Sequence, residues 1–179
     1  MTKTVVINGT NSNQSRVNGI ASYIQKQADA QIINVYDLPA QDLISGNYAS
    51  EAIQHKAAIV EQSDVVVILT PIYKASYTGI LKTFLDLLPQ KAFVNKIIVP
   101  IVVGGSERHQ LVIDYALKPV AAALGATIIT QGVFVHDKQI AVLNGSFTFD
   151  ETIEQRINEQ LPSQIHHQSG YVRQEAVTV

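Results

Sequence analysis

The sequence predicts an α/β fold in which a five-stranded parallel sheet lies between two layers of helices, and two observations predict it. Five short apolar runs alternate with segments whose apolar residues recur at helical spacing. Alternation of this kind produces parallel strands joined by right-handed crossovers. The third run, residues 65–69, is apolar without interruption and rich in valine, which is typical of a strand buried on both faces.

The predicted strands, in chain order, are residues 3–8, 31–35, 64–70, 96–103 and 127–135. Pro100 lies inside the fourth of these runs. Because proline has no N–H to donate to a β-ladder, we expect a bulge or an early end of that strand.

The predicted helices cover residues 16–29, 50–62 with Ser50 as the N-cap, 79–88 and 109–124, and a last helix capped by Asp150 has Ile153, Ile157 and Leu161 on one face. Residues 37–48 are expected to form a loose connection. Pro119 lies in the middle of the fourth helix and deprives the carbonyl of Tyr115 of its hydrogen-bond donor. Two outcomes are open, a π-bulge at Tyr115 or a simple kink.

Composition and charge narrow the function. The chain has no cysteine, which excludes disulfides, thiolate metal sites and thiol catalysis, and its net charge of -2 offers no basic footprint for nucleic acid. No signal-peptide pattern opens the chain and no apolar run is long enough to span a membrane, so we expect a cytoplasmic protein. Residues 1–161 are expected to form one domain, followed by a tail, 162–179, that is mobile or serves as an oligomerisation arm.

The expected strand order is 2-1-3-4-5, the flavodoxin-like winding, in which ligands lie at the carboxyl ends of strands one, three and four. Three polar turns follow those strands. The first, residues 9–16, lacks GxGxxG and GK[ST] but is dense in hydroxyl and amide side chains at a helix start. Thr10, Ser15 and Asn18 could donate to phosphate oxygens and Arg16 could supply charge. The alternative is a solvated loop in which Ser15 caps the helix.

The second and third turns are suited to a flat ligand. Pro71, Ile72, Tyr73 and Lys74 offer aromatic surface and backbone donors to a planar ring, unless the tyrosine is an ordinary half-buried residue at the rim. Gly104, Gly105 and Ser106 leave the backbone open over two residues, unless they form an ordinary strand-to-helix turn.

The sequence shows neither a nucleophile nor a metal site. The five histidines are dispersed without ligand spacing, and no GxSxG elbow is present. Redox chemistry carried by a bound cofactor is therefore the better fit.

The motifs NGTNSNQSR, TPIYKASYTGILKTFLDLLP, VGGS, DYALKPVAAALGA and GVF resemble the NAD(P)H-dependent FMN reductases, and most of all the subgroup that supplies reduced flavin to alkanesulfonate monooxygenases. The resemblance covers residues 3–137 and fades after Lys138. It implies FMN phosphate on Thr10, Ser15, Arg16 and Asn18, with the isoalloxazine between residues 71–74 and 104–106. It also implies a homodimer or homotetramer in which Tyr115 lies in a π-helix at the subunit interface, close to the flavin.

The resemblance therefore leads us to expect hydride transfer from NADPH or NADH to FMN, with reduced flavin passed to a partner monooxygenase. The hydride step needs no side-chain acid or base, so no catalytic residue is predicted. Two alternatives on the same fold are an FMN-dependent quinone or azo reductase and a flavodoxin-type electron carrier. A third is an interaction domain that binds no ligand.

Overall fold

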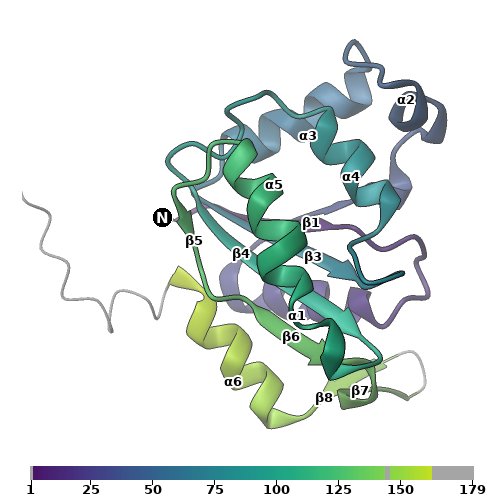
Figure 1. Ribbon diagram of the computed structural model, residues 1–179, viewed down its shortest axis with the longest axis vertical. Coiled ribbons are helices and arrows are strands. Elements are labelled where there is room, and N and C mark those ends of the chain that lie inside the picture. The colour runs from purple at the N-terminus through teal and green to yellow at the C-terminus, as the bar shows by residue number, and fades with distance from the viewer. Residues whose placement is uncertain (1, 144–145, 163–179) are drawn as a thin grey trace, which may run out of the picture.

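The computed structural model describes residues 2–143 and 146–162, and its centre is a parallel sheet with helices on both faces (Figure 1). The strand order is β2-β1-β3-β4-β5, with β6 also paired to β4, which confirms the predicted winding. The strands of this sheet are β1 Thr4–Asn8, β2 Gln31–Asn34, β3 Val65–Pro71, β4 Ile97–Gly104, β5 Ile128–Ile129 and β6 Val133–His136.

The helices follow the predicted order with two differences. A short helix, α2, occupies part of the expected loose connection, and α4 ends at Asp86 and not at Leu88. The α-helices are α1 Val17–Ala28, α2 Ala40–Ser45, α3 Glu51–Glu61, α4 Gly79–Asp86, α5 Lys118–Ala123 and α6 Glu151–Gln160. Shorter helices are η1 Val35–Asp37, η2 Glu107–His109, the π-helix η3 Ile113–Leu117, and η4 Asp137–Gln139.

Two apolar layers hold the helices against the sheet. One layer joins Ile20 and Ile24 of α1 and Ile153 and Ile157 of α6 to one face of the strands. The other joins α3, α4, η3 and α5 to the opposite face, with Phe84 at its centre. The predicted inward face of the last helix is confirmed, because Ile153, Ile157 and Leu161 are all buried.

The expectation for Pro100 is wrong, because β4 continues through it in register with β3. The missing N–H of Pro100 affects the pairing of β4 on its other side, toward β5 and β6. The Ile98 carbonyl still accepts a hydrogen bond from the β5 side, at 2.9 Å from Thr130 N. Pro100, two residues on, faces that same side and offers no donor. The predicted fifth strand is therefore split into β5 and β6, and between them Gly132 crosses close to Pro100 with a φ of +86°.

The predicted fourth helix contains the π-bulge. Tyr115 lies in η3, and the N–H of Lys118 donates to the carbonyl of Ile113, five residues earlier. Pro119 then lies in the first turn of α5, the part of a helix in which proline is best tolerated. Of the two outcomes left open by the sequence, the π-bulge is confirmed.

A β-hairpin that the sequence did not predict covers α1. Its strands are β7 Ile140–Leu143 and β8 Ser146–Phe149, which pair antiparallel. Phe147 lies directly over Gly19, where an added Cβ would come within 2.4 Å of the ring. The rings of Phe149 and Tyr23 meet edge to face at 5.8 Å, and Asn158 donates to the Tyr23 hydroxyl. Late segments of the chain therefore hold the first helix in place.

Lys96, just before β4, links the start of that strand to the end of α3. Its side chain is buried, and Nζ donates to the carbonyls of Glu61 at 2.7 Å and Ser63 at 2.6 Å, next to the end of α3. Burial lowers the pKa of Lys96. No helix in residues 2–143 and 146–162 is both long and apolar enough to cross a membrane. The predicted tail lies, beyond Pro162, outside the described residues.

Candidate functional site

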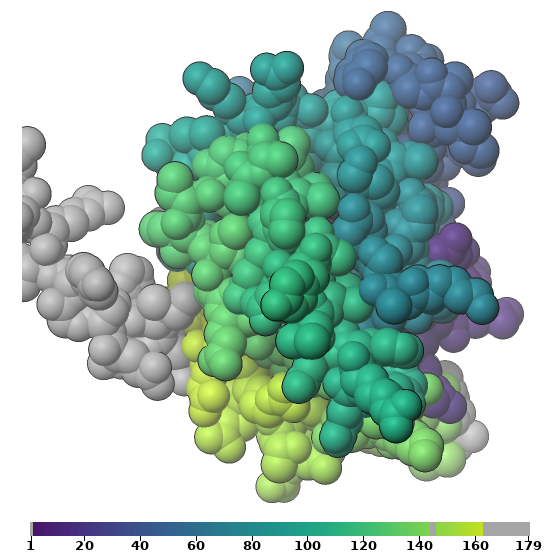
Figure 2. Space-filling view, viewed as in Figure 1, coloured from purple at the N-terminus to yellow at the C-terminus, as the bar shows by residue number. Residues whose placement is uncertain are grey.

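The three polar turns lie together at one edge of the sheet, as predicted. They follow β1, β3 and β4, whose carboxyl ends point the same way because the strands are parallel. The Thr78 hydroxyl at the end of the second turn donates to the carbonyl of Gly9 in the first. Ile72 N donates to the Val103 carbonyl at 2.9 Å, and so joins the second turn to the end of β4. Figure 2 shows the second turn, coloured blue-teal, projecting at the right-hand side next to the purple first turn.

A buried amide network supports the first turn. Asn8 is fully buried at the end of β1, and its Nδ2 donates to Asn18 Oδ1 at 2.8 Å and to Asn34 Oδ1 at 3.0 Å. Its Oδ1 accepts from Thr10 N at 3.3 Å. Sequence reasoning missed Asn8, although a polar residue that ends an apolar strand was a visible signal. The network links the first turn to the ends of β1 and β2.

Asn18 stabilises the first turn, and its side-chain amide has no hydrogen left to donate to a ligand. Its Nδ2 donates to the carbonyls of Ser12 at 3.1 Å and Asn13 at 2.8 Å. Both amide hydrogens are therefore used within the turn. In this arrangement the residue shapes the loop on which a phosphate would lie.

The other three predicted phosphate residues gather at the start of α1. Thr10 is fully buried, and its Oγ1 has no hydrogen-bond partner in the described parts of the chain. Ser15 Oγ accepts from Val17 N at 3.3 Å, which is the capping role that the alternative interpretation gave it. Arg16 is exposed, and its Nη1 donates to the Asp137 carbonyl at 3.3 Å. Arg16 uses one of its five N–H donors in this contact. Its remaining donors and the Thr10 hydroxyl, which has no partner among the described residues, lie at a helix N-terminus and fit a phosphate.

The second turn is tight and carries backbone strain. Tyr73 and Ser76 exchange two backbone hydrogen bonds of 2.9 and 3.1 Å, and Lys74 and Ala75 between them have φ values of +51° and +61°. Positive φ at both central residues is typical of a type I′ turn, which usually contains Gly or Asn. Non-glycine residues in this conformation cost about 1 kcal/mol each. Tyr73, which opens this turn, is 55% exposed.

The two glycines of the third turn differ in role. A Cβ on Gly104 would lie 3.0 Å from Ile72 Cδ1 and 3.1 Å from Phe134, so this glycine makes room for packing and not for a ligand. A Cβ on Gly105 would meet only Asp137 Oδ2, at 3.7 Å. Ser106 Oγ accepts from the backbone of η2 and caps it. Only Gly105 therefore offers open backbone to a flat ligand.

Tyr115 is 80% exposed on η3, and Leu111 four residues earlier is also exposed. The ring faces solvent, so contact with a ligand would require that ligand or a second subunit to reach it. The structure brings Tyr115 to the surface but does not itself close it over the three turns.

The segment after β6 joins the three turns, and sequence reasoning missed it. His136 pairs in register with Gly104, so Asp137 lies beside Gly105.

Within residues 2–143 and 146–162, no group of three or more His, Asp or Glu could hold a metal ion.

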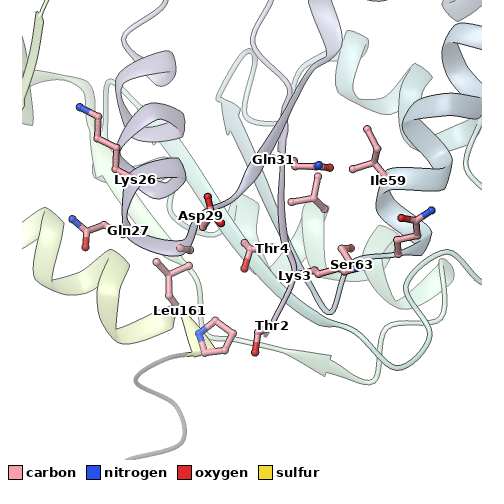
Figure 3. A pocket seen from close by; sticks show the side chains of 14 residues that line it. Thr2, Lys3, Thr4, Lys26, Gln27, Asp29, Gln31, Ile59, Ser63 and Leu161 are labelled. Carbon is pink, nitrogen blue, oxygen red and sulfur yellow. The ribbon is translucent and has the colours of Figure 1, made fainter.

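Two cavities lie elsewhere. One of about 640 Å³ is at the amino edge of the sheet, where Thr4, Asp29, Ile59, Ser63 and Leu161 contribute to its walls (Figure 3). The other, about 520 Å³, lies by Tyr48 and Leu87. Ligands of open parallel sheets bind at the carboxyl edge, where the polar turns are. The three turns line neither of these two cavities, so the candidate site is defined by the turns themselves.

Comparison with known proteins gives consistent results. The family model for NADPH-dependent FMN reductase matches residues 2–146. An FMN reductase (NADPH) of Pseudomonas putida is 44% identical over 71% of this chain, and the match spans 66% of that relative, just under two thirds of its length. An FMN reductase (NADPH) of Escherichia coli K12 is 32% identical over 89% of this chain and 86% of its own. The solved structure of an NADH:FMN oxidoreductase, EMOB, in its apo form is 32% identical with a TM-score of 0.76, over 98% of this chain and 92% of the other.

Proposed function

The chain belongs to the NADPH-dependent FMN reductase family, and from this premise we propose that it transfers hydride from NADPH or NADH to FMN. The observation that carries the proposal is the meeting of three turns at the carboxyl edge of the sheet. One has the cation Arg16 and a hydroxyl with no partner among the described residues at a helix N-terminus, and another has open backbone at Gly105.

The first turn binds the phosphate in this proposal. Arg16 supplies positive charge, and the N-terminus of α1 adds its unpaired N–H groups and dipole. Ser15 contributes a hydroxyl that already contacts the helix start. Thr10 lies beneath the loop surface, so its hydroxyl reaches a phosphate only when the loop shifts slightly. Asn18 acts by fixing the loop carbonyls.

The second and third turns hold the isoalloxazine. In this proposal one side of the ring lies along Pro71, Ile72, Tyr73 and Lys74, and the other along Gly104, Gly105 and Ser106. When FMN is bound it supplies the two-electron chemistry by accepting a hydride. The contribution of the chain is to bind and orient the ring while leaving one face open for the nicotinamide.

Reduced FMN passes to a flavin-dependent monooxygenase in this proposal, and the chain acts in the cytoplasm. The exposed Tyr115 and Leu111 on η3 support a homodimer or homotetramer, because a second copy that covered them would remove two large apolar side chains from water. Both relatives named above from bacteria are NADPH enzymes by name and the solved neighbour is an NADH enzyme by name, so NADPH and NADH remain the two candidate donors.

The test measures oxidation of NADPH and of NADH by the purified protein, with FMN added in increasing amounts. Saturable stimulation by FMN supports the proposal, and release of reduced flavin predicts that one protein molecule turns over many FMN molecules. Tightly retained FMN with quinone or azo-dye reduction would instead favour the alternative activity. Failure to oxidise either nucleotide contradicts the proposal.

Arg16→Ala tests the phosphate site directly. We expect FMN to bind about tenfold more weakly while riboflavin, which lacks the phosphate, binds as before. Flavin fluorescence titration measures both affinities. Lys26→Ala is the matched control, because Lys26 is an exposed cation in the last turn of the same helix. Equal losses for FMN and riboflavin would show that Arg16 does not bind the phosphate.

A further inference from the structure

The segment that follows β6 carries an acidic group at the edge of the proposed site. We propose that the carboxylate of Asp137 accepts a hydrogen bond from a hydroxyl of the bound nucleotide, on the ribityl chain of FMN or on a ribose of the nicotinamide nucleotide. This inference rests on the proposed function and adds to it a residue that orients the ligand between its phosphate and its ring.

Asp137 lies where the first and third turns meet. Gly104 and His136 pair in register, which places the following residues, Gly105 and Asp137, side by side. The position of a Cβ on Gly105 is 3.7 Å from Asp137 Oδ2, so the carboxylate lies against the open part of the third turn. On the other side, Arg16 Nη1 donates to the Asp137 carbonyl at 3.3 Å. The same residue therefore contacts both the predicted phosphate turn and the predicted ring turn.

The two oxygens of this carboxylate have different surroundings. Asp137 Oδ1 is buried and lies 2.9 Å from His136 Nδ1. Oδ2 faces the open part of the third turn at Gly105, and the side chain as a whole is 42% exposed. Oδ2 is therefore the oxygen that a ligand at this turn would reach, while Oδ1 anchors the carboxylate against the protein.

The turn that holds Asp137 is fixed by its own hydrogen bonds. His136 Nδ1 accepts from Lys138 N, and Gln139 Oε1 accepts from His136 N at 3.0 Å. This reciprocal capping holds η4 at its first residue, Asp137. The carboxylate is therefore positioned before any ligand arrives, which lowers the entropic cost of using it.

The chemistry of the group selects its partner. An ionised carboxylate only accepts hydrogen bonds, and it repels a phosphate. The backbone carbonyl of Asp137 contacts Arg16 at the phosphate end of the proposed site, and its carboxylate lies beside Gly105 at the ring end. A residue placed between these two ends faces the part of FMN that joins the phosphate to the ring. That part, the ribityl chain, bears hydroxyl groups, which donate well to a carboxylate. A ribose of the nicotinamide nucleotide offers the same donor.

The test compares flavins that differ in one part. Fluorescence titrations with FMN, riboflavin and lumiflavin, which lacks the ribityl chain, are carried out on the wild type, Asp137→Ala and Asp137→Asn. If the donor is ribityl, Asp137→Ala weakens FMN and riboflavin by the same factor of about ten and leaves lumiflavin unchanged. If the donor is a nicotinamide ribose, flavin affinities stay constant and KM for NADPH or NADH rises about tenfold at unchanged kcat. Asp137→Asn keeps an acceptor oxygen and lies between wild type and alanine variant in either case.

Asp29→Asn is the control, because Asp29 is an exposed aspartate at the far edge of the sheet. Circular dichroism confirms that each variant is folded. The inference is overturned if no affinity or KM changes, if all three flavins weaken equally, or if FMN alone is affected, since that last result would mean action through Arg16 and the phosphate. A wild type that binds no FMN refutes the proposed function instead, which keeps the two failures apart.

Discussion

Replacement of Gly132 by alanine tests the crossing that splits the fifth strand. The N–H that Pro100 lacks leaves a break between β5 and β6, and Gly132 passes through that break at a φ of +86°. An added Cβ would lie 2.7 Å from the Pro100 carbonyl oxygen and 2.8 Å from its Cγ. Neither atom belongs to a flexible side chain that could swing aside. Strand β6 would have to move, and with it the segment that carries Asp137.

The expected cost combines two effects. A non-glycine residue in the left-handed region costs about 1 kcal/mol. Relieving the contact with a central strand adds about 1–3 kcal/mol, the usual cost of overpacking. The free energy of unfolding should therefore fall by about 2–4 kcal/mol, which corresponds to a fall in Tm of about 5–15 °C for a domain of this size.

Two other glycines separate these effects. Gly46 has a φ of +67° with nothing within 4 Å of its Cβ position, so Gly46→Ala should cost the backbone effect alone. Gly79, at the start of α4, has neither a positive φ nor a neighbour, and Gly79→Ala should be neutral or slightly stabilising. Urea denaturation of the three variants gives the free energies. The reasoning is refuted if Gly132→Ala costs no more than Gly46→Ala at an unchanged m-value.

Three further predictions concern other parts of the molecule. Lys96→Met should lower the unfolding free energy by about 2 kcal/mol, because the carbonyls of Glu61 and Ser63 lose their donor. Chemical denaturation measures the change, and an unchanged value contradicts this role of Lys96. Hydrogen bonds from Ser50 and Asn47 lower the pKa of Asp42. The ionised carboxylate should therefore make the wild type more stable than Asp42→Asn. This difference should be complete above the ordinary pKa of 3.8 and should disappear as pH falls through the lowered pKa. Thermal melts of both proteins across acid pH measure it, and a difference that does not change with pH contradicts the prediction. Tyr115→Ala should change monomer stability by under about 0.5 kcal/mol, since the ring is exposed, yet dissociate the proposed oligomer in analytical ultracentrifugation; an intact oligomer would move the interface elsewhere.

The sheet was predictable because its evidence is local. Each buried strand is a short β-branched run, and each helix repeats its apolar residues at a fixed spacing, so order and layers follow from the alternation. A disturbance of the helix at Tyr115 was predictable for the same reason, since Pro119 removes a donor at a known distance along the helix, but the sequence left a π-bulge and a simple kink both open. Pro100 was harder, because its effect falls on a neighbouring strand that is distant in sequence.

The location of the site was predictable from the sequence, but the role of each of its residues was not. Turn composition located all three turns, yet it could not show that Gly104 is filled by Phe134 while Gly105 stays open. Nor could it show that Asn18 donates both of its amide hydrogens to loop carbonyls. Asp137 was missed because its importance comes from the register of β6 against β4, which no local pattern encodes.

The hairpin over α1 has a consequence for synthesis of the protein. Gly19 leaves the ribosome well before Phe147, which covers it. A nascent chain therefore exposes the surface of α1 around Gly19 to chaperones and to other chains until β8 has been made. Chains truncated before β8 should be prone to aggregation even though every strand of the main sheet is present.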